Sequence, residues 1–480
     1  MGKLRAILPY FIAGILCICI SIPAFCQSIY IDEAYSIEFA RGSISSVIEN
    51  SSLDDHPPLY YLIIKLAEIL GGESITKYRF VSLLPAYLNL IIIGATYVRK
   101  RFSSTSSIFY ILWFGAAYST FERSIAIRMY SWACFFVTAA CVALFTYYET
   151  DKASPKKKKT FLISILFTLA AMYTHYYALL AMLIAWAILL LVTFLQEKKA
   201  VRNVLGGGLI ITVAYLPWLI KFLTRPEVER IGDWTKPLEW GKWFLTPSEL
   251  LESSMTGIGL ILYVLVLGLV VVAFIRKNWL PLLSLSIFAG TMILGAVISV
   301  LIFPLWVSRF MYILWGMLSL FVAIVAGDKR DKSLCVPQIL LTGLLLLELL
   351  FSIQTMVQTE RIICNADEWV AFTEENIADG ACVIVDDPEE HVRIYRVYMP
   401  DADFTMTSQL YGEKAGEVLL TALSQAPEEQ CWFIMDYTQG AFGVDRMRAL
   451  LSDLGYDMHS VGNYRIEHKN MEIFQIGRNH

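Results

Sequence analysis

Carboxylates and a histidine gather in the polar segment that follows the first long apolar run of this chain. Asp32 and Glu33 are adjacent there, and Asp55 and His56 precede a Pro-Pro dipeptide later in the same segment. A charged pair beside a membrane-spanning run is costly to bury and adds little to packing, so it marks a candidate functional site. A carboxylate that reaches an incoming hydroxyl can accept its proton. We therefore expect Asp32 and Glu33 to be catalytic, although Asp32 alone could be only the polar end of a span.

The composition indicates a membrane protein. Of the 480 residues, 56% are hydrophobic and 17% are charged, whereas soluble domains carry about 25% charged residues. Apolar runs close to the ~20 residues that a spanning helix needs recur along the first three quarters of the chain. They predict about 11 transmembrane helices, at residues 6–26, 79–98, 106–121, 131–149, 160–175, 178–196, 203–223, 257–275, 279–302, 305–326 and 334–354. The sequence shows no basic patch typical of nucleic-acid binding.

Basic residues alternate between the predicted connections and set the expected topology. Clusters such as residues 99–101 and the lysine run 156–159 lie in every second connection, which the positive-inside rule places in the cytoplasm. The N-terminus is then cytoplasmic and the C-terminus extracytoplasmic. The apolar segment 59–70 has only about a dozen residues, too few to span. We expect it to be an interfacial helix within the first outer loop, residues 27–78.

With this topology several arginines lie in outer turns, against the charge rule. Snorkelling toward the membrane surface accounts for one such residue more easily than for a set. Guanidinium groups neutralise phosphate oxygens and can bind two at once. The sequence therefore predicts a phosphate site formed by Arg79, Arg123, Arg128 and Arg309.

Asp55, His56, Tyr60 and His175 are the candidate residues for binding an acceptor or substrate. Each has a plainer interpretation: Asp55 could cap the helix at 59–70, and His175 with its neighbouring tyrosines fits an interfacial aromatic belt. Carboxylate and imidazole groups also suit zinc or manganese. A divalent metal at His56 is therefore an alternative, although no close spacing of ligands supports it.

From about residue 356 the apolar runs shorten to strand length. Runs at 381–385, 431–435 and 471–476 alternate with helix-like segments at 367–377, 389–398, 417–423 and 445–454. That order is typical of a small α/β domain. We therefore expect a polytopic α-helical transmembrane domain at 1–355 and an extracytoplasmic α/β domain at 356–480.

The outer motifs together resemble a known family. They are Asp-Glu at 32–33, His-Pro-Pro-Leu-Tyr-Tyr at 56–61, Arg-X-Tyr at 128–130 and Arg-Phe at 309–310. In this combination they are similar to the lipid-sugar-dependent membrane glycosyltransferases of the GT-C superfamily, in particular family 39, the protein mannosyltransferases and aminoarabinose transferases. The resemblance covers about residues 1–355. Aminoarabinose transferases differ in having Lys before the Pro-Pro, where this chain has His56.

The resemblance implies a polyprenyl-phosphate sugar donor that is bound from the membrane. It also implies an extracytoplasmic acceptor, which is a glycan, a lipid or a protein. In such an enzyme Asp32 is the general base, Glu33 supports the base or the acceptor, and polyprenyl phosphate leaves with inversion at the sugar carbon. Arg128 and Arg309 would stabilise the charge that grows on the phosphate. The aromatic-rich spans favour the plasma membrane of a bacterium as the setting, with the surrounding membrane lipids as further partners.

A transporter or flippase of lipid-linked sugars is the alternative function. Transporters usually carry charges or broken helices near the bilayer midplane, often in paired halves. Here the charges gather at the outer rim and the sequence has no internal repeat, which favours an enzyme. A receptor that uses the tail as a ligand module would leave Asp32, Glu33 and Arg128 without a role.

Overall fold

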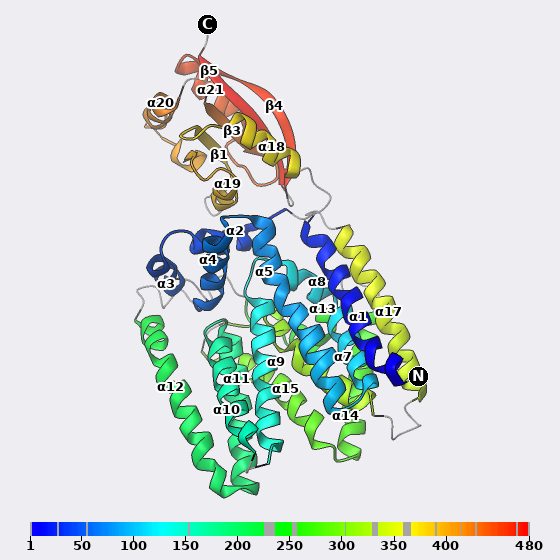
Figure 1. Ribbon diagram of the computed structural model, residues 1–480. Coiled ribbons are helices and arrows are strands. Elements are labelled where there is room, and N and C mark those ends of the chain that lie inside the picture. The colour runs from blue at the N-terminus through cyan, green and yellow to red at the C-terminus, as the bar shows by residue number, and fades with distance from the viewer. Residues whose placement is uncertain are drawn as a thin grey trace. The chain divides into compact units, whose positions relative to one another are not determined.

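A computed structural model describes the chain in two compact units (Figure 1). We call Met1–Phe25 with Phe39–Met356 the membrane unit, and Cys26–Glu38 with Val357–His480 the C-terminal unit. The short segment that carries Asp32 and Glu33 thus belongs to the C-terminal unit. The division at residues 355 and 356 stays a prediction. The described residues are 2–25, 28–53, 56–151, 154–224, 236–251, 257–302, 304–328, 335–358, 366–388, 391–412, 414–427, 430–466 and 469–478.

The membrane unit is built from helices. Among the described residues, nine segments are long and apolar enough to cross a membrane: Arg5–Phe25, Ile75–Arg101, Tyr130–Glu149, Tyr176–Gln196, Lys198–Leu223, Ile258–Ile275, Trp279–Leu301, Ser308–Ala326 and Pro337–Val357. Each of them coincides with a predicted span. The prediction of a polytopic helical membrane protein with a small C-terminal α/β part is therefore confirmed.

Two predicted spans are not in that set. The segment 106–121 contains two helices, α7 (Ser104–Ala116) and α8 (Tyr118–Ile125), because Ala117 between them is extended at φ −64° and ψ 132°. The Thr120 hydroxyl donates to the carbonyl of Phe114 at 2.6 Å and satisfies one acceptor at this break. The segment 160–175 lies in α10 (Pro155–Met172), whose first turns hold the lysine run 156–159.

The remaining helices of this unit follow the chain in order. They are α1 (Gly2–Ser21), α2 (Ile31–Ala40, whose last two residues lie in this unit), α3 (Ile44–Leu53), α4 (Leu59–Gly71), α5 (Ile75–Leu88) with a wide π-type continuation (Asn89–Val98) and α6 (Arg99–Arg101), α9 (Tyr130–Glu149), α11 (Tyr176–Gln196), α12 (Val201–Leu223), α13 (Trp240–Leu251), α14 (Ile258–Ile275), α15 (Trp279–Leu301), a 3₁₀ segment (Ser308–Leu314) that leads into α16 (Trp315–Ala326), and α17 (Cys335–Val357).

Small residues and stacked rings pack the centre of the membrane unit. A Cβ atom on Gly316 would lie 2.0 Å from the Thr138 hydroxyl, so only glycine lets α16 approach α9 this closely. Trp113 of α7 stacks on Trp315 of α16, with ring centroids 5.8 Å apart. The Ser284 hydroxyl of α15 donates to the carbonyl of Met317 at 2.6 Å. Helices far apart in the sequence are held together by these contacts.

The segment predicted to be interfacial is helix α4, which has 13 residues. At 1.5 Å per residue it is about 20 Å long, shorter than the ~30 Å hydrocarbon core of a bilayer. Tyr60 and Tyr61 are buried, whereas Leu66, Ile69 and Leu70 are exposed, so one face packs inward and the other is an apolar surface. Its location at the membrane interface stays a prediction.

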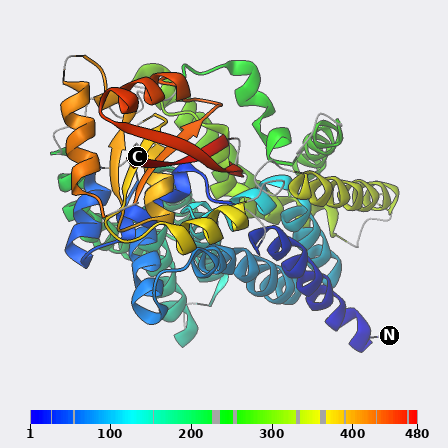
Figure 2. The same ribbon diagram turned by 90° about the horizontal axis from the view of Figure 1, so that it is seen from above.

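The C-terminal unit has a five-stranded sheet in the order β2-β1-β3-β5-β4. The strands β1 (Cys382–Asp386), β2 (Asp403–Met406) and β3 (Cys431–Asp436) are parallel, and β5 (Lys469–Arg478) runs antiparallel to both β3 and β4 (Tyr456–Ile466). A register shift between Ser460 and Gly462 accompanies the curvature of the β4–β5 ribbon, drawn in red in Figure 2.

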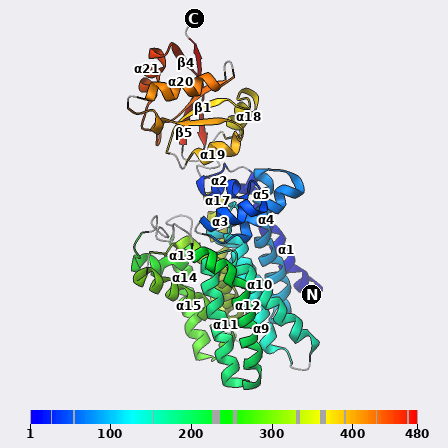
Figure 3. The same ribbon diagram turned by 90° about the vertical axis from the view of Figure 1, so that its left-hand side faces the viewer.

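Helices cover both faces of this sheet (Figure 3). Helices α20 (Ala415–Gln425) and α21 (Val444–Asp453) pack on one face through Leu419 and Leu451, against Ile384 and Phe433. Helices α18 (Ala366–Asn376) and α19 (Val392–Tyr398) pack on the other through Trp369 and Tyr395. The strands β1 and β3 are therefore buried along their whole length, as expected of central parallel strands.

Candidate functional site

Three of the predicted motifs and His175 meet in the membrane unit. His56 precedes α4, Tyr130 begins α9, His175 precedes α11, and Phe310 lies in the 3₁₀ segment before α16. The ring centroids of His56 and His175 are 5.1 Å apart, those of His175 and Phe310 4.8 Å, and those of Tyr130 and Phe310 6.0 Å. We call these four residues the histidine–aromatic cluster. It joins the Pro-Pro, Arg-X-Tyr and Arg-Phe motifs into one site.

Hydrogen bonds fix the segments that carry the two histidines. The amide of Leu59, at the start of α4, donates to the carbonyl of Tyr173 at 2.9 Å. His175 Nδ1 accepts from the amide of Tyr177 at 3.0 Å, so the imidazole caps the N-terminus of α11. Because Nδ1 is an acceptor there, the hydrogen of the neutral ring is on Nε2. His175 is only 2% exposed and is packed inside the protein, which is unlike a residue of an interfacial belt.

Three of the four predicted arginines lie beside this cluster. The guanidinium carbon of Arg123 lies 5.9 Å from the ring centroid of Tyr130, and that of Arg309 lies 5.8 Å from the ring of Phe310. Arg128 is two residues before Tyr130 and is buried. Burying a guanidinium is costly unless anionic or polar groups surround it. Arg123 also pairs with the Glu122 carboxylate at 2.8 Å. Guanidinium groups beside aromatic rings are suited to binding an anion.

Arg79 and Tyr60 lie on the neighbouring helices α5 and α4. The Tyr60 and Ser82 hydroxyls are 2.8 Å apart and join the two helices, and Arg79 lies one turn before Ser82. Arg79 is 1% exposed. The indole of Trp132 on α9 donates to the carbonyl of Val81 at 3.2 Å, which ties α5 to the helix that Tyr130 begins. The helix that carries Arg79 is therefore held by α4 and α9, the helices that also position His56 and Tyr130.

Asp32 and Glu33 lie in the first turn of α2, within the C-terminal unit. Glu33 is fully buried, and its Oε2 accepts from the amide of Tyr30 at 3.1 Å. This reach of a third-position Glu back to the start of its helix is a capping interaction. Asp32 is partly exposed, and the helix dipole favours a carboxylate at this position. Asp32 is therefore the more accessible carboxylate, and Glu33 the one that orders the helix start.

The prediction for Asp55 lies outside the described residues, as does Asp54. Among the residues that the structure describes, no group of three or more His, Cys, Asp or Glu side chains is arranged to hold a metal ion. His56 and His175 are in contact through their rings. A requirement for a divalent metal stays a prediction.

The sequence assigned no role to two polar groups at the site, the Tyr130 hydroxyl and the Glu249 carboxyl group. The Tyr130 hydroxyl is buried and has no hydrogen-bond partner within the described part of the chain. Such a group costs about 1–3 kcal/mol, so it indicates a place where a ligand supplies the missing bond. Glu249 of α13 hydrogen-bonds to Ser308, next to Arg309. Partial burial raises the pKa of its carboxyl group more than the bond to Ser308 lowers it. The Arg-X-Tyr motif, which places Tyr130 two residues after Arg128, was a sequence signal for the Tyr130 hydroxyl. No motif surrounds Glu249.

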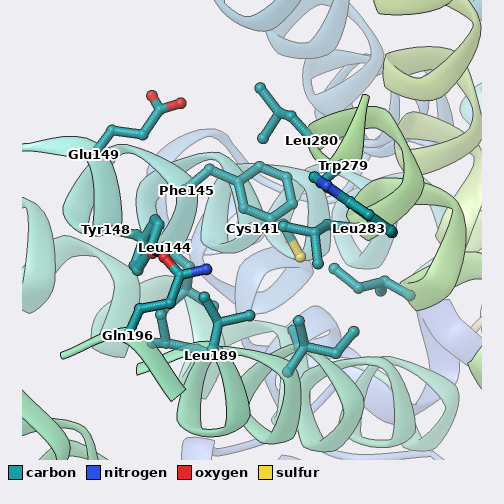
Figure 4. Close-up of a pocket in the computed structure, with 14 residues that line it drawn as sticks. Cys141, Leu144, Phe145, Tyr148, Glu149, Leu189, Gln196, Trp279, Leu280 and Leu283 are labelled. Atoms are coloured by element: carbon teal, nitrogen blue, oxygen red, sulfur yellow. Dashed lines mark hydrogen bonds between the residues drawn. The ribbon is translucent and has the colours of Figure 1, made fainter. Parts of the chain in front are cut away.

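A separate cavity of about 410 Å³ lies between α9, α11 and α15 (Figure 4). Its walls are apolar, and its polar side chains, among them Tyr148, Glu149 and Gln196, come from the last turns of α9 and α11. Both helices begin at the histidine–aromatic cluster and end at this cavity, and a helix of 20 residues, such as α9, spans about 30 Å. None of the described candidate site residues lines the cavity, so it is not part of the candidate site.

The C-terminal unit holds a buried ion network at the carboxyl ends of β1 and β3. Lys469 donates to Asp387 at 2.6 Å and to Asp436 at 2.8 Å, and His391 lies 2.9 Å from Asp387. The ammonium group and both carboxylates are almost fully buried. Burial alone would raise the pKa of Asp387, but the hydrogen bond from His391 and the charge of Lys469 lower it below its ordinary value.

Replacing Lys469 by Met is expected to destabilise the C-terminal unit. Two buried carboxylates would lose their cation, which typically costs about 3–5 kcal/mol of unfolding free energy. The unfolding free energy is measured by titrating the full chain with urea and monitoring hydrogen exchange of the sheet amides. Lys414→Met, at an exposed lysine of the same unit, is the matched control and should change the free energy by less than about 0.5 kcal/mol. Equal effects of the two substitutions would contradict this role of Lys469.

Acid is expected to destabilise the same unit. The pKa of Asp387 is lower in the folded than in the unfolded state, so its ionised form favours folding above the ordinary value of 3.8. That contribution is lost as the pH falls from 3.8 through the lower folded-state pKa. Protection of the β1 and β3 amides measured from pH 6 downward should therefore fall in this acidic range. Protection that is constant across the range would contradict the lowered pKa.

Comparison with known proteins identifies the fold. No protein-family model matches the sequence, and no curated protein matches it. The crystal structure of ArnT from Cupriavidus metallidurans in the apo state is similar, with a TM-score of 0.63, 11% identity and coverage of 97% of both chains. The same protein bound to undecaprenyl phosphate has a TM-score of 0.53 at 11% identity and 97% coverage of both chains. At this identity the likeness is one of fold. The chain thus has an ArnT-like fold, as its motifs predict.

Proposed function

We propose that this protein is an integral-membrane glycosyltransferase. It moves a sugar from a polyprenyl-phosphate donor to a hydroxyl group of an extracytoplasmic acceptor. The observation that carries the proposal is the convergence of the Pro-Pro, Arg-X-Tyr and Arg-Phe motifs on one cluster within an ArnT-like fold. The ArnT structure with bound undecaprenyl phosphate supports the class of leaving group.

The proposed reaction is a direct displacement at the anomeric carbon of the sugar. The acceptor oxygen forms the new bond to this carbon while the bond from the carbon to the phosphate oxygen breaks. The electron pair of that bond stays on the polyprenyl phosphate, and the acceptor proton passes to the Asp32 carboxylate. Attack opposite to the leaving group inverts the configuration. Glu33 contributes by ordering the first turn of α2, through its bond to the amide of Tyr30.

Guanidinium groups stabilise the leaving group in this proposal. Arg128 and Arg309 balance the charge that develops on the phosphate, and Arg79 and Arg123 add to the positive field. The Nε2 hydrogen of His175 and the Tyr130 hydroxyl are donors for the phosphate or sugar oxygens. Asp55, His56 and Tyr60 bind the acceptor, and the protein acts in a bacterial plasma membrane with its C-terminus outside.

A panel of polyprenyl-phosphate sugars, offered to the protein in proteoliposomes, tests the proposed function. We expect one donor to lose its sugar in the presence of an envelope extract that supplies acceptors. Parallel reactions with a chelator test the metal alternative. If every donor stays intact while labelled lipid crosses the bilayer, the protein is a transporter of lipid-linked sugars and the proposal is wrong.

Tyr130→Phe is expected to weaken binding of the sugar donor without lowering the stability of the protein. Removing an unsatisfied buried hydroxyl should leave the unfolding temperature unchanged or slightly raised, whereas loss of one hydrogen bond to the sugar donor should weaken binding about tenfold. Donor affinity and thermal unfolding of the purified protein measure the two effects. The control is Tyr110→Phe, at a buried tyrosine of α7 whose hydroxyl donates to Asn89. Unchanged affinity in Tyr130→Phe would show that this hydroxyl does not meet the donor.

A further inference from the structure

Helix α2 is fastened to helix α19 inside the C-terminal unit. Glu38 accepts hydrogen bonds from Arg393 and, at 3.5 Å, from Arg396. The guanidinium carbon of Arg393 also lies 4.1 Å from the ring centroid of Tyr35, a close cation–π contact. We call Tyr35, Glu38, Arg393 and Arg396 the α2–α19 clasp. It joins residues 355 positions apart in the sequence.

The clasp lies on the part of α2 that also carries Asp32. Residues three apart are neighbours on a helix surface, so Tyr35 lies next to both Asp32 and Glu38 on α2. Glu38 is about 9 Å from Asp32 along the helix axis. A contact that holds Tyr35 and Glu38 therefore fixes the rotation of the helix and with it the direction of the Asp32 side chain.

Helix α2 needs such an external support. It has 10 residues, whereas isolated helices shorter than about 12–15 residues are marginal in water. The ion pair between Arg393 and Glu38 can support the helix. Their side chains are 30% and 24% exposed and hence partly shielded from water. Ion pairs that are fully exposed to water contribute little to stability. The partial shielding of this pair and the stacking of Arg393 on the Tyr35 ring strengthen it.

Helix α19 is a rigid base for the clasp. The Tyr395 hydroxyl donates to Asp387 at 2.9 Å, and the Tyr395 ring packs against Trp369 with centroids 6.1 Å apart. Asp387 is in turn held by Lys469. The base of α19 is therefore tied to the buried network of the sheet. Functional groups are most precise when they are supported by elements whose own side chains are locked in place.

We infer that the C-terminal unit orients the candidate general base through this clasp, which makes Glu38, Arg393 and Arg396 positioning residues for Asp32. The inference rests on the proposed function, because it assigns a purpose to the orientation of Asp32. A proton acceptor must lie within hydrogen-bond reach of the hydroxyl, and a misplacement of about 1 Å can lower the rate about 100-fold. In this inference the C-terminal unit contributes to catalysis by orienting Asp32.

A charge exchange in the full-length protein tests the clasp. We expect Arg393→Glu and Glu38→Arg each to lower kcat by about 10- to 100-fold, with the KM for the sugar donor unchanged. The double variant, which restores an ion pair of reversed polarity, should recover activity to within about threefold to tenfold of wild type. Arg448→Glu is the control, since Arg448 pairs with Asp457 at 3.1 Å elsewhere in the same unit and should change neither constant.

Hydrogen exchange of the α2 amides gives a readout that does not depend on turnover. We expect faster exchange of residues 31–40 in both single variants and restored protection in the double variant. If wild type transfers sugar and the single variants keep both their kcat and their α2 protection, the inference is wrong. If wild type consumes no donor, the proposed function fails, while α2 protection still reports whether the clasp forms.

Discussion

Asp32→Asn is expected to lower the rate of sugar transfer by about 10²- to 10⁴-fold, the usual contribution of a general base. The amide has nearly the same shape as the carboxylate but cannot take the acceptor proton. Asn is also well tolerated at the start of a helix, so α2 should keep its structure. Single-turnover transfer from the donor that the panel identifies measures the rate, and the affinity for the donor should change by no more than about twofold.

Glu33→Gln is the matched control for that substitution. The bond that Glu33 accepts from the amide of Tyr30 can be accepted equally by the oxygen of a Gln side chain. We therefore expect this variant to keep its rate to within about tenfold of wild type. A large loss of rate in Glu33→Gln together with an active Asp32→Asn would reverse the two roles and contradict the proposed mechanism.

Arg128→Gln is expected to lower transfer by about 10²- to 10³-fold, as the loss of one preorganised group facing a developing anion does. Arg128 is buried and lies two residues before Tyr130 in the histidine–aromatic cluster. Arg128→Lys should recover only part of the rate, because an ammonium group lacks the paired donors of a guanidinium. Arg276→Gln, at the end of α14 in a connection predicted to be cytoplasmic, is the control and should leave transfer unchanged.

Ligand discrimination separates a phosphate contact from a structural role of Arg128. Wild type should be stabilised against heat by polyprenyl phosphate more than by the polyprenol of the same length. Arg128→Gln should lose this difference while its unfolding temperature without lipid stays close to that of wild type. A variant that still distinguishes the phosphate from the alcohol would show that Arg128 does not bind the leaving group.

The sequence was sufficient for much of the fold. Nine predicted spans recur as helices of the described structure because length and apolarity alone define a membrane-spanning segment. In the C-terminal unit the apolar runs at 381–385, 431–435 and 471–476 correspond to β1, β3 and β5, which are central in the sheet. The edge strands β2 and β4 were not predicted. β2 has only four residues and β4 is polar over much of its length, so neither has the apolar run that marks a buried strand.

The site was less predictable, because its contacts join distant segments. The motifs pointed to Arg128, His56 and His175, but the packing of both histidines against Phe310 depends on tertiary structure. The assignment of α2 to the C-terminal unit was also beyond the sequence, since a single Glu38 gives no indication of a partner at Arg393. Apolar residues recur with a period that predicts helices and strands, whereas a single long-range charge pair has no such pattern in the sequence.

The most direct test of the account is a mass balance of the lipid fraction. Proteoliposomes that contain either wild type or Asp32→Asn are incubated with the identified donor and an acceptor, and the lipids are analysed by mass spectrometry. We predict that wild type forms one polyprenyl phosphate for each sugar transferred, and that the variant forms almost none while still binding the donor. A donor that remains intact with wild type, or equal amounts of polyprenyl phosphate from both proteins, would contradict sugar transfer with Asp32 as the base.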